Sequence, residues 1–145
     1  MKRFVILLLA LAACSHAAPP ANGISPNGGE VTARRAVESF LGAVRAQDLQ
    51  AMSLIWGTSK GPARDVVDRA QLEKRELIMQ CYLGHDSFKI LTDTPQKPDT
   101  HVLHVSLTKG TITRETSFTA VLGPHDRWYV QDADLEPVRD LCATG

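Results

Sequence analysis

The sequence predicts an α+β domain in which three N-terminal helices pack on a curved, four-stranded antiparallel sheet. Two observations carry this prediction. Apolar residues recur at helical spacing in the first half of the chain, and after Gly84 the chain changes to segments rich in Val, Ile, Thr and aromatic residues, separated by turns. Because each helix needs an apolar partner, helices that precede antiparallel strands pack on one face of the sheet. We place the domain at residues 31–142, followed by a tail at 143–145.

The three helices are predicted from their caps and their apolar spacing. Thr32 is a suitable N-cap for the first helix, Asp48 for the second and Asp68 for the third. Gly57 ends the second helix by taking the left-handed conformation, and the third helix ends near Gly84. The apolar residues of the first helix lie three and four positions apart: Ala36, Val37, Phe40, Leu41 and Val44. The third helix contains QLEKRELIMQCYL, which is rich in strong helix formers.

Four strands are predicted over residues 87–92, 101–108, 111–122 and 128–132. Lys109 and Gly110 form a short turn suited to a hairpin, and residues 123–126 form a longer turn into the last strand. Consecutive strands therefore pair antiparallel.

The N-terminus has the features of an export signal. Lys2 and Arg3 precede a short apolar run at 4–11, and the segment Leu11-Ala12-Ala13-Cys14 resembles the lipobox of bacterial lipoproteins. The resemblance implies a signal peptide at 1–13 and a lipidated Cys14 that anchors the protein to a membrane, and Ser15 resembles the sorting signal for the periplasmic face of the outer membrane. A secretory peptide cut after an alanine, with Cys14 unmodified, is the alternative. A membrane span needs about 20 apolar residues, more than this run supplies.

Residues 14–30 are predicted to be the lipidated cysteine and a disordered tether. The segment after Cys14 is rich in Pro, Ala, Asn, Ser and Gly and has no apolar period. A flexible coil of this kind spaces the domain from the lipid and carries no chemistry of its own.

Composition and motifs exclude several classes of function. The 16 basic and 16 acidic residues give no basic face for nucleic acid. His101 and His104 lie three apart in a strand and point to opposite faces, so together they form no metal site. No phosphate-binding, dinucleotide-binding or nucleophile motif occurs, and we expect no cofactor.

Two segments carry a resemblance to a known family. The segments AQDLQAMSLIWG and RWYVQDADLEP, with the opening helix, resemble the NTF2-like, or cystatin-like, α+β cone fold, and in particular its small bacterial lipoprotein members of unknown function. Enzymatic members of the family usually carry a strand pair before the third helix. Residues 57–68 are short and poor in β-forming residues, so we expect no such pair and no deep, closed cone.

The candidate site residues come from strand alternation. In catalytic members of the family, such as the ketosteroid isomerases and small polyketide cyclases, polar side chains point into the cone. Here Arg114, Asp132 and His101 share the parity of the core-facing residues on their strands, and Trp128 is a candidate lining residue. Arg114 and Asp132 form either a rim ion pair or part of a pocket. Arginine keeps its proton, so the set lacks a clear acid/base pair and we name no catalytic residue.

Cys81 and Cys142 remain after Cys14 is assigned to the lipid. An even pair in an oxidising compartment predicts a disulfide, and two free thiols are the alternative.

Three functions stay open at this stage. The first is a non-catalytic envelope lipoprotein whose domain binds a protein partner or a small molecule. The second is a small lyase or isomerase of the cone fold, and the third is a carrier of an apolar ligand in the cell envelope. The first is favoured because acid/base catalysis requires a suitable pair of groups.

Overall fold

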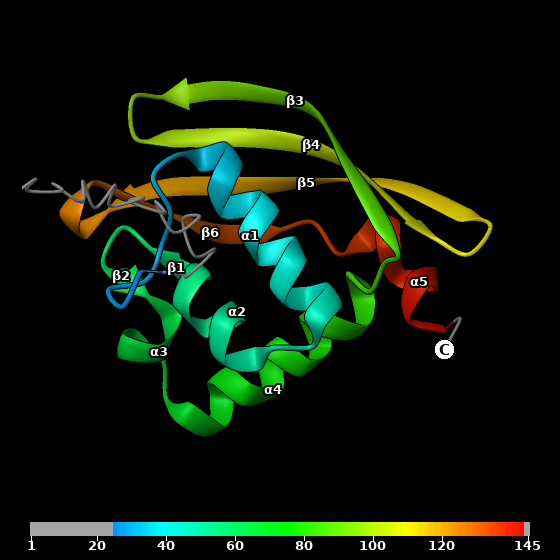
Figure 1. Cartoon of the computed structure of the whole chain (residues 1–145), viewed down its shortest axis with the longest axis horizontal. Coiled ribbons are helices and arrows are strands. Elements are labelled where there is room, and N and C mark those ends of the chain that lie inside the picture. The colour runs from blue at the N-terminus through cyan, green and yellow to red at the C-terminus, as the bar shows by residue number, and fades with distance from the viewer. Residues whose placement is uncertain (1–24, 144–145) are drawn as a thin grey trace, which may run out of the picture.

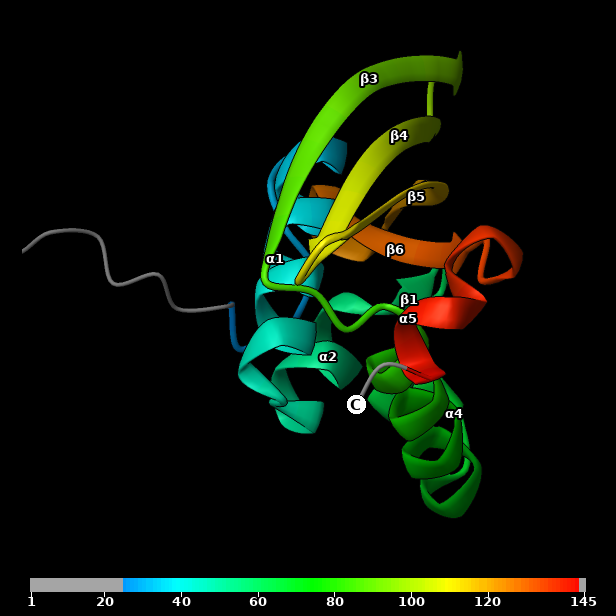
Figure 2. The same ribbon diagram turned by 90° about the vertical axis from the view of Figure 1, so that its right-hand side faces the viewer.

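The first helix, α1 (Ala33–Ala46), lies across one face of a sheet built from β3 (Ser87–Lys97), β4 (Thr100–Lys109), β5 (Ile112–Gly123) and β6 (Arg127–Ala133) (Figure 1). The computed structural model describes residues 25–143, so the predicted signal peptide, Cys14 and the last two residues lie outside the described residues. The helices α2 (Leu49–Ile55) and α4 (Arg69–Tyr82) lie beyond α1, on the same side of the sheet (Figure 2). The predicted α+β architecture is confirmed.

The sheet has the strand order β3-β4-β5-β6, with every neighbouring pair antiparallel. Strands β3, β4 and β6 are longer than predicted, and β3 in particular continues to Lys97 rather than ending at residue 92, whereas β5 has the predicted length and is shifted by one residue. Extra residues interrupt the β3–β4 register after Ile90 and the β5–β6 register at Thr119. Such bulges bend the strand and change which side chains face the helices.

The predicted N-caps are present, but Gly57 does not end α2 in the left-handed conformation: the helix ends at Ile55, Trp56 is extended, and Gly57 begins β1. The Thr32 hydroxyl accepts the backbone N–H of Arg35, and the Asp48 carboxylate accepts that of Ala51. The Asp68 carboxylate accepts two N–H groups at the start of α4. These side chains satisfy donors that a helix start leaves without partners, so they fix where the helices begin.

The segment between α2 and α4 contains a strand pair, so the expectation that residues 57–68 hold none is wrong. It forms a two-stranded ladder of β1 (Gly57–Thr58) and β2 (Gly61–Pro62), followed by a four-residue helix, α3 (Ala63–Val66). Weak β propensity does not prevent the ladder because each strand is only two residues long. A 3-10 turn η1 (Pro124–Asp126) precedes β6, and η2 (Glu136–Val138) and α5 (Arg139–Ala143) follow it, so the helices outnumber the three predicted.

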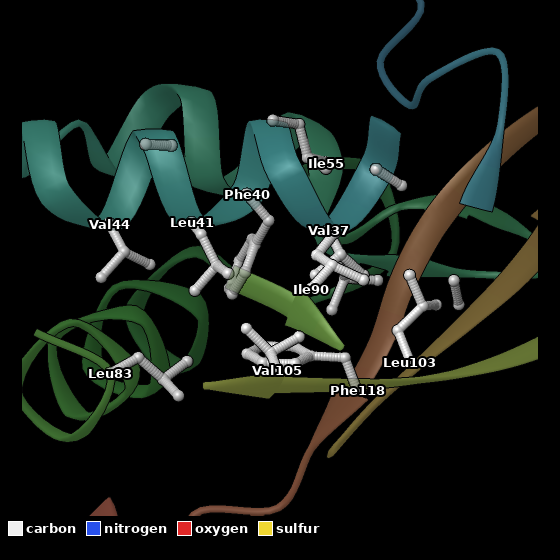
Figure 3. Close-up of a cluster of buried hydrophobic side chains, with 14 of the residues drawn as sticks. Val37, Phe40, Leu41, Val44, Ile55, Leu83, Ile90, Leu103, Val105 and Phe118 are labelled. Atoms are coloured by element: carbon white, nitrogen blue, oxygen red, sulfur yellow. The ribbon is translucent and has the colours of Figure 1, made fainter. Parts of the chain in front are cut away.

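The core lies between α1 and the sheet, with α2 and the end of α4 closing it (Figure 3). Phe40 of α1 meets Phe118 of β5 edge to face, with ring centroids 6.5 Å apart. The predicted stripe of α1 is fully buried, and Leu103, Val105 and Leu107 of β4 face it. The helical period and the strand alternation therefore identified the two surfaces that meet.

The chain joins the domain earlier than predicted. Residues 25–30, here called the N-terminal strap, lie within the segment predicted as a disordered tether. Gly29 N–H donates to the carbonyl of Leu54, and Glu30 and Trp128 exchange two backbone hydrogen bonds. Gly28 and Gly29 have positive φ, and a Cβ at Gly29 would lie 2.9 Å from the ring of Tyr129. Glycine thus permits the close approach that seats the strap.

The predicted disulfide joins Cys81 and Cys142 and fastens α5 to the end of α4. The C-terminal segment is also part of the core, since Val138 and Leu141 are fully buried. Over residues 25–143, no helix has the length and apolar character needed to cross a membrane.

Candidate functional site

Arg114 is placed differently from the prediction. It lies near the start of β5, where its side chain is 43% exposed, and it forms an ion pair with Asp140 of α5. The predicted partner, Asp132, takes no part in this pair. Strand alternation could not identify Asp140 as the partner, because it lies on α5 and not on the sheet.

Asp132 does not face the core. It pairs with Thr119 on β5, whereas Val130 pairs with the next residue, Ala120, so Gln131 is an extra residue in β6. A one-residue insertion reverses the side-chain alternation beyond it. Ala133 therefore packs against the core, and Asp132 is exposed.

His101 and Trp128 meet on the face of the sheet that carries α1. His101 lies opposite Ala120, which is fully buried, so strand alternation places it on that face, as predicted. Its ring and the ring of Trp128 meet edge to face, with centroids 4.8 Å apart. Trp128 is held in place by its two backbone hydrogen bonds with Glu30 of the strap.

Asp93 completes this group, and the sequence prediction missed it. Its carboxylate lies 2.6 Å from Nδ1 of His101. The predicted strand ended one residue before Asp93, and the bulge after Ile90 brings Asp93 opposite the core residue Leu103. A bulge has no sequence signal here, so alternation alone did not identify this carboxylate. We call Asp93, His101 and Trp128 the inner-face cluster.

The hydrogen-bonding polarity of the inner-face cluster follows from the Asp93 carboxylate, which only accepts, so Nδ1 of His101 carries the proton in their contact. A neutral His101 whose Nδ1–H donates to the Asp93 carboxylate presents Nε2 as an acceptor. Both side chains are about three-quarters buried, at 24% and 26% exposure. The cluster therefore offers an oriented acceptor beside an aromatic ring, which suits a ligand with a hydrogen-bond donor and an apolar body.

A second polar group lies at the other end of the sheet, in a pocket of about 390 Å³ lined by His85, Arg45, Lys109 and the disulfide. Nδ1 of His85 lies 2.8 Å from the carbonyl of Leu83, and Nε2 is buried with no hydrogen-bond partner among the described residues. Burial lowers the pKa of His85, which keeps the ring neutral.

A third polar group lies between α2, α3 and α4. Glu76 is only 3% exposed and lines a pocket of about 390 Å³. Burial raises the pKa of the Glu76 carboxyl from 4.5 to about 7, and the neighbouring carboxylate of Glu73 adds to this shift. In the sequence this segment is recognisable as a good helix former, and Glu76 was not predicted as a site residue.

Among residues 25–143, no group of three or more His, Cys, Asp or Glu residues is placed to hold a metal ion. The inner-face cluster has a single imidazole and a single carboxylate.

No protein-family model matches the chain, and no curated protein matches it. Among solved structures, the chain is similar to an NTF2-like protein of unknown function from Shewanella oneidensis MR-1. The TM-score is 0.43 and the sequence identity 14%, over 69% of this chain and 92% of the other. The chain itself has helices on one face of a four-stranded antiparallel sheet.

Proposed function

We propose that the chain is a lipid-anchored protein of the cell envelope whose NTF2-like domain binds a small ligand at the inner-face cluster. The observation that carries the binding site is the Asp93–His101 contact beside Trp128, on the core-facing side of the sheet. The lipobox resemblance of Leu11-Ala12-Ala13-Cys14 supports the anchor.

The geometry indicates the chemistry of the ligand. Nε2 of His101 accepts one hydrogen bond, and the ring of Trp128 supplies an apolar surface next to it. A small ring that carries a hydroxyl group matches both features. A hydrocarbon ring of the same size lacks the donor, so it would cover the acceptor without pairing it, which costs binding free energy.

Binding is tested with phenol and toluene as a matched pair. The NMR signals of the imidazole groups of the five histidines report the binding. We expect phenol to shift the His101 resonances and toluene to bind more weakly. His101→Gln should weaken phenol binding, while His104→Gln, on the opposite face of the same strand, should leave it unchanged. Equal binding of the two rings, or equal loss in the two variants, would contradict the proposed site.

The anchor is tested by metabolic labelling with a fatty-acid probe. The wild-type chain should be labelled and should partition with membranes, and Cys14→Ala should do neither. Equal labelling of both chains would disprove lipidation at this residue.

Acid/base catalysis is the second candidate function, and the same contact favours it. A carboxylate that orients a histidine is an arrangement used by general bases. Its test is the exchange of the α-hydrogens of cyclohexanone with deuterated water, followed by NMR. A rate above the buffer rate that is lost in Asp93→Asn would support an enzyme, and a wild-type rate equal to that of His101→Gln would exclude this chemistry.

A further inference from the structure

Glu76 occupies a position that the fold reserves for an apolar side chain. The inner stripe of α4 runs through Leu72, Glu76 and Met79 to Leu83 at its end, at steps of three and four residues. Leu72 and Leu83 are buried, and Met79 packs against the core. A buried carboxyl group is costly unless it has partners, so its place in this stripe calls for an explanation.

The carboxyl group is incompletely satisfied. Oε1 of Glu76 is fully buried and has no hydrogen-bond partner among the described residues. The side chain lines the pocket between α2, α3 and α4, together with Glu73 one turn earlier on α4. The carboxyl group therefore has no donor inside the protein at Oε1, and the pocket is the side from which a cationic group can approach it.

The same pocket carries the opposite charge at its other end. Arg64 of α3 and Arg69, the first residue of α4, also line it. Arg64 donates to the carbonyl of Pro26 at 2.9 Å and contacts Asp65 at 3.4 Å, which holds its guanidinium near the pocket. Arg69 and Glu76 are seven positions apart on one helix, which is a rise of about 10 Å along its axis.

The distribution of charge selects the class of ligand. A simple anion pairs with the arginines and leaves the Glu76 carboxylate without an opposite charge. A simple cation supplies the donor and meets two guanidinium groups. Only a molecule with both signs of charge satisfies both ends of the pocket.

We propose that this pocket binds a small zwitterion, with its ammonium group at Glu76 and Glu73 and its carboxylate at Arg64 and Arg69. The leucine side chains of the lining, Leu49 and Leu72, contact the methylene chain between the two charged groups. The spacing of the charges favours an ω-amino acid of several methylene groups over glycine. This site is separate from the inner-face cluster and does not depend on the function proposed there.

Ligand binding is coupled to a proton in this arrangement. The charged groups that line the pocket around Glu76 are Glu73 and Arg69 of α4 and Arg64 of α3, and α2 contributes only uncharged lining residues. Because Glu76 titrates near neutral pH, part of the population holds a proton in the free protein. An ammonium group favours the ionised carboxylate, so binding near pH 7 releases a proton.

The test is calorimetric titration of the full chain in mild detergent with glycine, 4-aminobutyrate and 6-aminohexanoate. Butyrate and butylamine serve as single-charge controls. We expect at least one of the longer zwitterions to bind more tightly than glycine and than either control, with a heat that depends on the ionisation enthalpy of the buffer. No zwitterion binding, or binding of butyrate or butylamine as tight as that of 4-aminobutyrate, would overturn the proposal.

Single substitutions distinguish binding in this pocket from a nonspecific effect of the charge of the protein. Glu76→Gln should weaken zwitterion binding by about tenfold, as expected for loss of one charge-assisted hydrogen bond, while the exposed Glu115→Gln should change it by less than about twofold. Arg69→Gln, at an exposed position, provides a second variant should Glu76→Gln not fold, and it should weaken binding by about fivefold. Unchanged affinity in a folded Glu76→Gln or in Arg69→Gln would refute the assignment.

Discussion

The buried carboxyl of Glu76 makes the stability of the protein depend on pH in a direction opposite to that of a paired carboxylate. In the unfolded chain the group titrates near its usual pKa of 4.5, and burial raises this to about 7 in the folded protein. Between these two values the folded state holds more protons than the unfolded state. The free energy of unfolding therefore falls as the pH rises through this window.

The magnitude follows from the shift. One pKa unit corresponds to about 1.4 kcal/mol, so the rise from 4.5 to about 7 amounts to about 3 kcal/mol. Below pH 4.5 the neutral carboxyl costs no ionisation energy, and above pH 7 the full cost is present. Glu76→Gln removes the titration and keeps the shape of the side chain.

The assay is urea unfolding of the wild type and of Glu76→Gln at pH 4, 6 and 8, followed by the fluorescence of Trp56 and Trp128. Relative to the wild type, the variant should gain about 3 kcal/mol of stability between pH 4 and pH 8. All other titrating groups are common to both chains and cancel in this difference. Glu115→Gln, an exposed control, should show no such trend, and a Glu76→Gln difference that stays constant with pH would refute the reasoning.

Two further predictions concern the C-terminal segment. Replacing both Cys81 and Cys142 by Ser should lower the free energy of unfolding by about 4 kcal/mol, the loop-entropy value for a separation of 61 residues, measured by urea unfolding. The variant should keep its secondary structure in circular dichroism because Leu141 stays buried, and a loss below about 1 kcal/mol would contradict the entropy argument. Arg114→Ala and Asp140→Ala should each cost less than about 1 kcal/mol, since the pair is exposed, and a double-mutant cycle should show coupling between them. Asp132→Ala should leave stability unchanged. Coupling between Asp132 and Arg114 in a second double-mutant cycle would instead support the ion pair predicted from the sequence.

The sequence predicted those parts of the fold that depend on local chemistry. Thr32, Asp48 and Asp68 cap helices by contacts with residues two or three positions away, and such short-range patterns are visible in the chain. The stripe of α1 and the alternation of β4 are periodic over several turns or residues. They correctly identified the two surfaces of the core.

The site residues depended on features without a sequence signal. Single extra residues in β3 and β6 bring Asp93 to the core-facing side and turn Asp132 away from it. The partner of Arg114 comes from α5, 26 positions further along the chain. Leu77 and Ile78 are apolar but exposed, so the apolar pattern of α4 does not show which face is buried, and Glu76 is not identified from it.

The N-terminal strap has a consequence for where the domain works. Its hydrogen bonds with Trp128 place the point where the chain enters the domain directly beside the inner-face cluster. About ten residues separate Cys14 from Ser25, a reach of at most about 40 Å even when fully extended. With Cys14 lipidated as proposed, the cluster stays within a few nanometres of the bilayer surface whatever the orientation of the domain. The protein then samples ligands from a thin layer next to the membrane, where molecules that partition into lipid are most concentrated, and not from the bulk of the compartment.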